Sequence, residues 1–430
     1  MSKPQDHFRY NRESLLATDG VNLCEIVDLT GTPVYVYSAS ALLDPLQRLR
    51  RGLATLEHMV CFAVKANSNI HVLRLLSEAG AGMDLVSGGE LYRAVHAGVP
   101  PERVVFSGVG KTPGEMAAAL EAGIFSFNIE SEPEIEMLQA VASQLGRKAS
   151  IALRFNPDVD AKTHPYISTG LKKNKFGLEK REILKIARSI NKLSHLQIAG
   201  ISIHIGSQIT TLKPMKDAFK KLLELHDQLN RILPEPLRFL DIGGGLGITY
   251  KKENPPSIEA YCKLITQVFS RIADRRLAQP VKILLEPGRT ISGNAGALIT
   301  EVLYRKTRGS KKDFLILDAA MNDLMRPALY GSYHEIIPVE RGKSKGKLKK
   351  TDLVGPVCET SDCFASDRPF PTRVQPGDLV AILSSGAYGF SMSSTYNTRP
   401  RPTEVLVENG NFRVIRHRES FEDLIRHELP

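Results

Sequence analysis

The sequence predicts an α/β protein, with a (β/α)8 TIM-like barrel joined to a mostly antiparallel β-sandwich or β-barrel domain. Three observations lead to this prediction. Eight short apolar segments recur between residues 60 and 287, stretches with helical periodicity separate them, and short alternating strands replace this pattern after about residue 290. A doubly wound open sheet is the alternative, but eight units that open with a strand give the count of a barrel.

The eight segments are continuously apolar, which is typical of parallel strands covered by helices. We expect strands at Val60–Val64, Met83–Val86, Val104–Phe106, Phe125–Ile129, Ser150–Phe155, Gly200–Ile205, Phe239–Ile242 and Ile283–Glu286. Amphipathic helices are expected between them, at Ile70–Ala79, Gly89–Ala97, Glu115–Ala122, Glu132–Leu145, Lys180–Ile190, Met215–Leu233 and Ile258–Leu277.

The last part of the chain has the pattern of an antiparallel β domain. Turn signals such as Asn409-Gly410 separate short segments with strand character. These are Ala297–Arg305, Phe314–Leu317, Leu379–Leu383, Thr403–Glu408 and Asn411–Ile415. We therefore expect a barrel domain over residues 36–289 and a β domain built from residues 1–35 and 290–430.

The composition is that of an ordinary soluble protein, with 42% apolar and 24% charged residues. No apolar run reaches the roughly 18 residues of a membrane span, and the first residues lack the apolar core of a secretory signal. We therefore expect a cytoplasmic protein without a membrane partner. Five scattered cysteines argue against a disulfide framework and for a reducing compartment. Their spacing does not suggest a zinc site, so no metal is expected.

Much of the net charge of +10 lies in two stretches, Arg305–Lys312 and Arg341–Lys350. A basic segment can bind nucleic acid without sequence preference. The second stretch, however, contains glycine and serine and no aromatic residue. We expect it to be a solvated hairpin tip, and we expect no nucleic-acid partner.

Lys65 directly follows the first expected strand, within the run Val-Cys-Phe-Ala-Val-Lys-Ala-Asn at residues 60–67. Removing an ammonium group from water costs several kcal/mol unless the group is paired. The pKa of a buried lysine falls readily, which suits a Schiff-base lysine. A lysine that reaches from the strand end into water is the simpler alternative.

The residues that follow the other strands favour the functional interpretation, because the site of such a barrel lies at the carboxyl ends of its strands. Glycines at 243–247 can bring backbone N–H groups close to a phosphate, although their spacing matches neither a Rossmann fingerprint nor a P-loop. The strand ends carry Ser87-Gly-Gly89, Arg154, Asn156, His204 to Gln208, Asp241 to Gly247, and Glu286 to Arg289.

Two of these side chains have both a structural and a chemical interpretation. His204 is either a satisfied core histidine or part of a site. Glu286 either pairs with Arg289 to tie its loop, or is a carboxylate that keeps a ring nitrogen protonated. A lysine, a phosphate cradle and a carboxylate for a pyridinium together describe a pyridoxal phosphate site.

The β domain adds a second set of functional groups. Cys358 lies beside Glu359, and a thiol can donate a proton to a carbanion, although free cysteines are usually small buried hydrophobes. Arg326, Tyr330 and Tyr388 lie in loops that contain glycine or proline, where binding groups concentrate. Arginine is suited to bidentate carboxylate binding.

Together these motifs resemble the diaminopimelate decarboxylase family, whose members are fold type III pyridoxal phosphate enzymes. The glutamate of EPGR counts against alanine racemase, which places an arginine near the pyridine nitrogen. One loop reads CET where CES is the common family form, and Thr360 keeps the hydroxyl. The resemblance covers nearly the whole chain and rests on FAVKAN (62–67), HPYISTGLKKNKFG (164–177), HIGSQ (204–208), DIGGGLG (241–247), EPGR (286–289), RPALY (326–330), GPVCET (355–360), GAYG (386–389) and YNTRPRPTEVLV (396–407).

The resemblance implies a role for each of these residues. Lys65 binds the cofactor covalently and Cys358 donates a proton, so these two are the expected catalytic residues. Cofactor contacts are expected from Lys65, His204, Gly243, Gly244, Gly245, Glu286, Gly288, Arg289 and Tyr388. Substrate contacts are expected from Arg289, Arg326, Tyr330, Glu359 and Tyr388.

The resemblance also implies the reaction, which is decarboxylation of meso-2,6-diaminopimelate to lysine, the last step of lysine biosynthesis. The expected assembly is a homodimer in which the Cys358 loop of one chain completes the site of the other. A related decarboxylase for ornithine, arginine or a carrier-bound substrate is one alternative, which Arg326 and Tyr330 disfavour because they suit a second carboxylate. A non-catalytic regulator or a nucleic-acid-binding protein is the alternative from another class.

Overall fold

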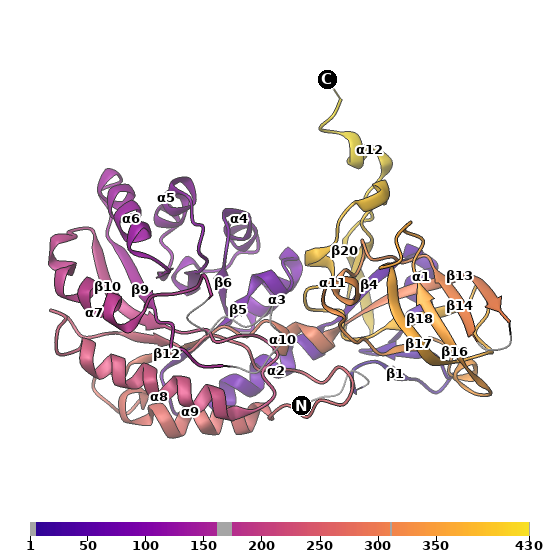
Figure 1. The fold of residues 1–430 in the computed structure, drawn as a ribbon, viewed down its shortest axis with the longest axis horizontal. Coiled ribbons are helices and arrows are strands. Elements are labelled where there is room, and N and C mark those ends of the chain that lie inside the picture. Colours follow the sequence, from indigo (N-terminus) through magenta and orange to yellow (C-terminus); the bar gives the residue numbers. More distant parts are fainter. Residues whose placement is uncertain (1–5, 161–173, 310–311, 430) are drawn as a thin grey trace. The chain divides into compact units, whose positions relative to one another are not determined.

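The computed structural model describes residues 6–160, 174–309 and 312–429. The chain divides into two compact units, one formed by residues 44–247 and 254–290, the other by residues 2–43, 248–253 and 291–430. Figure 1 shows a barrel in the first unit and a broad sheet in the second. It stays a prediction that the barrel unit binds the cofactor and that the β unit completes the substrate-binding site.

The first unit contains a closed barrel of eight parallel strands, which confirms the predicted fold class and excludes the open sheet. Closure comes from the pairing of β12 with β5. Each strand overlaps one of the segments expected from the sequence. The strands are β5 (His58–Ala63), β6 (Gly82–Leu85), β7 (Val104–Phe106), β8 (Ser126–Ile129), β9 (Ala149–Arg154), β10 (Leu196–Ser202), β11 (Phe239–Asp241) and β12 (Lys282–Leu285).

Helices lie outside these strands (Figure 1). Several begin where a polar side chain accepts a hydrogen bond from a backbone N–H group of the first turn, as Ser87 does for Glu90 and Ser131 for Glu134. The helices that lie wholly or partly in this unit are α2 (Ala39–Gly52), α3 (Ile70–Glu78), α4 (Gly88–His96), α5 (Pro113–Ala122), α6 (Glu132–Gln144), α7 (Lys180–Ser189), α8 (Leu212–Leu229), α9 (Ile258–Ala273) and α10 (Arg289–Ser292).

The second unit contains a nine-stranded sheet that is mostly antiparallel, as predicted. Its longest strand, β13 (Gly296–Arg308), pairs with β4 and β18 along its first half and with β14 along its second half. The pairs β14–β16 and β4–β19 are parallel. The other strands are β4 (Val34–Ser38), β14 (Lys312–Leu317), β15 (Ile336–Pro338), β16 (Leu348–Val354), β17 (Cys363–Pro371), β18 (Leu379–Ile382), β19 (Thr403–Glu408) and β20 (Asn411–Arg416).

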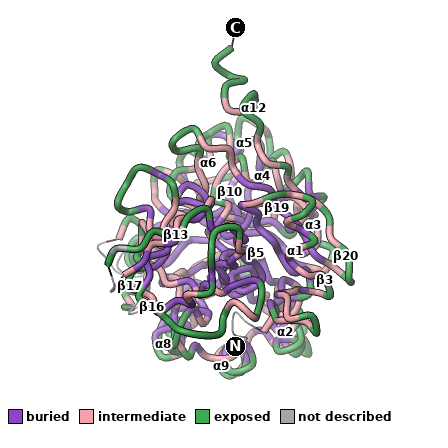
Figure 2. The backbone as a smooth tube through the Cα atoms, turned by 90° about the vertical axis from the view of Figure 1, so that its right-hand side faces the viewer, coloured by how far each residue is buried: buried purple, intermediate pink, exposed green. Residues whose placement is uncertain are grey.

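Smaller elements complete this unit. A three-stranded sheet is formed by β1 (Arg9–Tyr10), β2 (Leu16–Thr18) and β3 (Val21–Asn22), and it is followed by α1 (Leu23–Thr30). The core of the unit is apolar and includes Val36, Ile299 and Val405 from neighbouring strands. Figure 2 shows the strands as buried, whereas the C-terminal helix α12 (Phe421–Ile425) is largely exposed.

The basic stretch Arg341–Lys350 is not the hairpin tip that the sequence suggested. Residues 341–347 lie between β15 and β16, and residues 348–350 already belong to β16. These two strands do not pair with each other, because β15 pairs with β18 while β16 pairs with β14 and β17. Strand partners that lie far away in the chain cannot be deduced from local periodicity, which explains the error.

All five cysteines are free thiols. Within the described ranges, no helix combines the length and the apolar character that crossing a membrane requires.

Candidate active site

The alternation of side chains along the barrel strands carries polar groups to one end of the barrel. An apolar cluster inside the barrel includes Cys61, Val105, Ala152, Phe239 and Leu284. Side chains in a strand repeat their direction every two residues. The positions two residues further along point to the same interior and are occupied by Ala63, Ser107, Arg154, Asp241 and Glu286.

A cavity of about 200 Å³ opens at this end of the barrel. Three residues that the sequence predicted as site residues, Lys65, His204 and Glu286, line it together. They meet there because the carboxyl ends of parallel strands lie at one end of a barrel. The remaining lining residues are Val86, Ser107, Gly108, Asn128, Arg154, Phe176, Ser202 and Ile203.

Lys65 forms an ion pair with a carboxylate that the sequence analysis missed. Its Nζ donates to Asp84 Oδ2 at 2.5 Å. The Asp84 side chain is completely buried, whereas that of Lys65 is 35% exposed. Asp84 Oδ1 has no hydrogen-bond partner among the residues that the structure describes. Because a buried carboxylate requires a cation, this contact favours a positioned Lys65 over a lysine that only reaches into water. An acidic residue inside the expected strand Met83–Val86 was the available signal.

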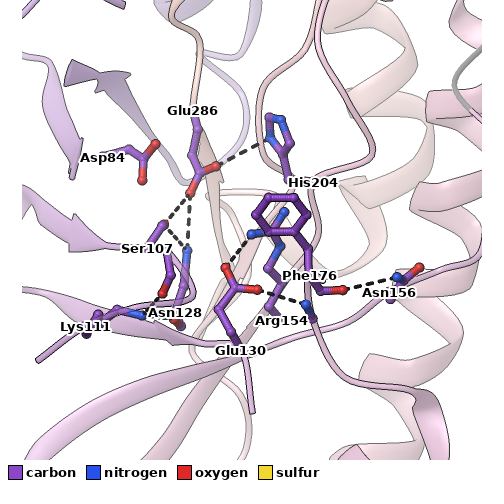
Figure 3. A network of polar contacts seen from close by, with 12 residues as sticks. Asp84, Ser107, Lys111, Asn128, Glu130, Arg154, Asn156, Phe176, His204 and Glu286 are labelled. Atoms are coloured by element: carbon purple, nitrogen blue, oxygen red, sulfur yellow. Dashed lines mark hydrogen bonds and ion pairs between the residues drawn. The ribbon is translucent and has the colours of Figure 1, made fainter. Parts of the chain in front are cut away.

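Glu286 lies in a buried network with Ser107 and Asn128 (Figure 3). Its Oε1 accepts hydrogen bonds from Ser107 Oγ at 3.3 Å and from Asn128 Nδ2 at 3.2 Å. Asn128 Nδ2 also lies 3.0 Å from Asp241 Oδ2. Burial, together with the charges of Asp241 and Asp84, raises the pKa of Glu286 well above its usual range, and burial also raises the pKa of Asp241. The raised pKa favours the protonated form of Glu286 in the protein without a ligand.

The structural alternative for Glu286 is not realised. Glu286 and Arg289, which are both described, form no ion pair with each other. Arg289 Nη2 instead donates to Ser207 Oγ at 3.2 Å. The carboxyl group of Glu286 is thus directed into the network and the cavity, and it does not tie its own loop.

We expect cofactor-free Glu286→Gln to be more stable than the cofactor-free parent chain at pH 8, and equally stable at pH 4. The folded pKa of Glu286 is raised, so its contribution to stability is fully present below the unfolded pKa, about 4.3, and is lost as the pH rises through the folded pKa. Glutamine does not ionise and escapes this loss, which is about 1.4 kcal/mol for each pH unit between the two pKa values. Denaturant unfolding across this pH range measures the difference.

The matched control for that experiment is Glu224→Gln, because Glu224 lies exposed on α8. This variant should follow the parent chain at every pH. An identical pH dependence for Glu286→Gln and the parent chain would contradict the raised pKa of Glu286.

His204 is neutral and oriented by the backbone. Its Nδ1 accepts a hydrogen bond from the N–H group of Gly244 at 3.2 Å. Burial, followed by the charges of Arg154 and Lys65, lowers the pKa of His204 well below its usual range. The distance of 3.8 Å from Nδ1 to Glu286 Oε2 therefore does not represent an ion pair. The ring lines the cavity, and the role of His204 in a site stays a prediction.

A second network surrounds Arg154 at the rim of the cavity (Figure 3). Arg154 Nη1 donates to Glu130 Oε1 at 2.5 Å, and Glu130 Oε2 accepts from the N–H group of Gly177 at 2.9 Å. The Arg154 guanidinium lies 4.8 Å from the centre of the Phe176 ring. Glu130 was not among the expected site residues. The string at 164–177 lies outside the described residues as far as residue 173. The sequence does not reveal whether the segment 158–175 acts as a lid, and most of that segment lies outside the described residues as well.

The glycine loop after β11 has a packing reason for its composition. Gly243 and Gly245 have φ values of +67° and +101°, which favour glycine. A Cβ atom on Gly244 would lie 2.1 Å from the carbonyl oxygen of Glu286. Neither these glycines nor Gly288 line the 200 Å³ cavity. Their contact with a phosphate, and that of Arg289, stays a prediction.

The other expected site residues lie in the second unit. Arg326 and Tyr330 belong to the short helix α11 (Arg326–Tyr330), and Tyr388 follows β18 with a φ of +56°. Cys358 and Glu359 are exposed in the connection between β16 and β17.

Two residues of the string at 396–407 contact this exposed pair. Glu359 Oε1 accepts a hydrogen bond from the Tyr396 hydroxyl, which lowers the pKa of Glu359. The Cys358 thiol lies 3.6 Å from Asn397 Oδ1. The structure therefore assembles Lys65, His204 and Glu286 in one unit, and Cys358 and Glu359 in the other.

Comparison with known proteins decides the family. Residues 42–293 match the family model described as "Pyridoxal-dependent decarboxylase, pyridoxal binding domain". A diaminopimelate decarboxylase of Aquifex aeolicus (strain VF5) is 47% identical over 419 residues, a match that covers 97% of this chain and 96% of the relative. The chain belongs to the diaminopimelate decarboxylase family.

Further relatives agree with this membership. A diaminopimelate decarboxylase of Pseudomonas aeruginosa is 48% identical, with 97% of this chain and 98% of the relative covered. The crystal structure of diaminopimelate decarboxylase from Helicobacter pylori complexed with L-lysine superimposes with a TM-score of 0.88 at 40% identity, covering 95% of this chain and 99% of that chain. The resemblance inferred from the motifs is thereby confirmed.

The cavity fits the pyridoxal group that the description of the family model names. Such a group needs an amine for its aldehyde and an acidic partner for its ring nitrogen, and Lys65 and Glu286 line the same cavity. Ser202 Oγ is buried and has no hydrogen-bond partner in the described part of the chain, and Ser202 also lines the cavity. A bound ligand can satisfy this hydroxyl group.

Proposed function

We propose that this chain is a cytoplasmic enzyme that decarboxylates meso-2,6-diaminopimelate to L-lysine with pyridoxal phosphate as cofactor. One observation carries the proposal. Lys65, His204 and Glu286 converge on one cavity in a chain that matches diaminopimelate decarboxylases along 97% of its length. Five free cysteines are consistent with a reducing compartment.

The barrel residues would hold the cofactor. When bound, pyridoxal phosphate supplies an electron sink for the electron pair that departing carbon dioxide leaves behind. Lys65 is the amine that would attach to it, and Asp84 orients that amine. Glu286 would place an acidic group at the ring nitrogen, and the neutral ring of His204 offers a flat face in the cavity.

The β-domain residues would bind the substrate. Arg326, Tyr330 and Arg289 suit a carboxylate, and Glu359 suits the distal amine. Tyr388 would contact both cofactor and substrate. Cys358 would return a proton to the carbon that has lost carbon dioxide, since a thiol near a carbanion is an adequate acid. We also infer a homodimer in which the Cys358 loop completes the partner's site, which agrees with the exposure of Cys358 in the single chain.

We expect Cys358→Ala to bind the cofactor normally and to lose turnover by about 10²–10⁴-fold, the range for removal of a general acid. Visible absorbance measures the cofactor, and carbon dioxide release measures turnover. Cys363→Ala, at a thiol five positions away, is the matched control and should keep its activity. Full activity in Cys358→Ala would remove the thiol from the reaction.

The same variant tests the shared site. Mixing inactive Cys358→Ala with inactive Lys65→Ala should restore about a quarter of the parent activity, because random exchange makes half of the dimers mixed and gives each mixed dimer one intact site. No recovery after exchange would contradict a site shared between two chains.

A substrate panel separates the proposal from its nearest alternative. The crystal structure of lysine/ornithine decarboxylase from Vibrio vulnificus is 23% identical to this chain and shows only that the fold is shared. Carbon dioxide release is expected from diaminopimelate in preference to ornithine and arginine. Preference for either of these amino acids would overturn the substrate assignment. A preparation that stays colourless after cofactor addition would overturn the enzyme class.

A further inference from the structure

The Arg326 side chain is buried and contacts His334, Ser332 and Tyr250. Its Nη1 lies 3.0 Å from His334 Nε2, and its Nη2 donates to Ser332 Oγ at 3.3 Å. The guanidinium lies 4.8 Å from the centre of the Tyr250 ring. Arg326 is only 5% exposed. These three contacts orient the guanidinium plane, and none of them adds a negative charge.

The hydrogen bonds of His334 determine its tautomer. Its Nδ1 lies 2.9 Å from the carbonyl oxygen of Leu383. A carbonyl oxygen only accepts, so Nδ1 carries the proton. In a neutral ring Nε2 is then an acceptor, which is the role that an arginine N–H group requires. A protonated ring would instead place a second positive charge next to Arg326.

The position of the His334 ring is fixed from several sides. His334 is completely buried, and its carbonyl oxygen accepts from Arg368 Nη1 at 2.7 Å. The next residue, Glu335, accepts a backbone hydrogen bond from Leu383 at 2.8 Å. The Tyr250 ring contacts the imidazole edge to face, with ring centres 5.5 Å apart. A side chain held in this way can orient another one, because it does not turn itself.

We propose that His334 is a positioning residue that orients Arg326 for a carboxylate of the substrate through its unprotonated Nε2. This inference rests on the proposed function, in which Arg326 binds that carboxylate. A guanidinium binds a carboxylate best through two parallel hydrogen bonds, so a rotation of its plane weakens the contact. His334 therefore contributes to substrate binding without touching the substrate.

The test compares two replacements of similar polarity and different reach. In His334→Asn the amide can still donate to the Leu383 carbonyl, but it is too short to meet Arg326. In His334→Gln the amide oxygen reaches the position of Nε2 and accepts from Arg326. We expect His334→Asn to raise KM for diaminopimelate about tenfold or more with kcat changed less than about threefold, and His334→Gln to restore most of the lost KM. Cofactor absorbance should be the same in all three proteins.

A double-mutant cycle with Arg326→Lys separates positioning from a general effect on folding. In the Arg326→Lys background, His334→Asn should cause no further rise in KM, since the group that it orients is gone. Ser332→Ala should raise KM by a smaller factor than His334→Asn does. This variant keeps the buried histidine, so it can still be measured if His334→Asn does not fold. Additive effects, or equal KM values for the asparagine and glutamine variants, would overturn the inference.

Calorimetric binding of L-lysine, the product that keeps the second carboxylate and is not consumed by the proposed reaction, to the holoenzyme separates a failure of this inference from a failure of the proposed function. A weaker dissociation constant for L-lysine in His334→Asn than in the parent protein supports the inference without any need for turnover. An unchanged dissociation constant overturns the role of His334, while a parent protein that binds diaminopimelate and releases no carbon dioxide overturns the proposed function.

Discussion

We expect Lys65→Arg to lower decarboxylation by about 10³-fold or more while the protein stays folded. Arginine keeps a positive charge opposite Asp84, whose carboxylate is completely buried and lies 2.5 Å from the lysine Nζ in the parent chain. It has no amine that can attach to the aldehyde of the cofactor, because the guanidinium group stays protonated. The variant therefore separates the chemical role of Lys65 from its electrostatic role.

Lys65→Ala is the comparison variant, because it removes both roles. Its loss of activity should equal that of Lys65→Arg, but its unfolding free energy should be lower by about 1–2 kcal/mol. This decrease in unfolding free energy is smaller than the decrease for a fully buried ion pair, because the Lys65 side chain is 35% exposed. Visible absorbance, borohydride reduction with peptide mapping, and denaturant unfolding provide the three measurements. A retained absorbance band in Lys65→Arg, or equal stability of the two variants, would contradict the assignment.

Glu286→Gln is expected to retain the cofactor and to lower kcat by about 10²–10³-fold, the range seen when one preorganised electrostatic partner is removed. Glutamine has the size of glutamate and can still hydrogen-bond to Ser107 and Asn128. It has no ionisable proton to share with a ring nitrogen, so the reacting centre loses the acidic group that promotes electron uptake.

The measurement is turnover under saturating substrate, with the absorbance spectrum as the control for bound cofactor. Glu224→Gln again serves as the matched variant, because it makes the same chemical change at an exposed position on α8. Turnover of Glu286→Gln within about threefold of the parent would place Glu286 away from the ring nitrogen.

Much of the barrel and part of the site could be predicted from local patterns. The continuous apolar runs and the helical stretches between them predicted eight strands, and each expected strand overlaps an observed one. Lys65, His204 and Glu286 were predicted because each lies at or just beyond the end of such a run. Where the pattern concerned partners far apart in the chain it failed, as with the hairpin expected at 341–350.

The residues that sequence analysis missed are partners of the predicted ones. Asp84 contacts Lys65, and Asn128 contacts Glu286 across 158 positions of the chain. Each lies inside an apolar strand, and a single polar residue there does not reveal which neighbour it will meet. The barrel brings these strands together by pairing β12 with β5, and only then do the contacts exist.

By itself, the sequence determined the alternation of strands and helices, the chemistry carried at the strand ends, and membership of the family, because all three depend on residues close together in the chain. Only the tertiary structure decided the protonation states and pairings of the site. The raised pKa of Glu286, the neutral His204 and the Asp84–Lys65 ion pair follow from burial and from distances between separate strands. The same is true of the His334 tautomer, which the Leu383 carbonyl sets from 49 positions away. Electrostatic free energies depend on these distances and on exclusion of water, and neither quantity exists before the chain has folded.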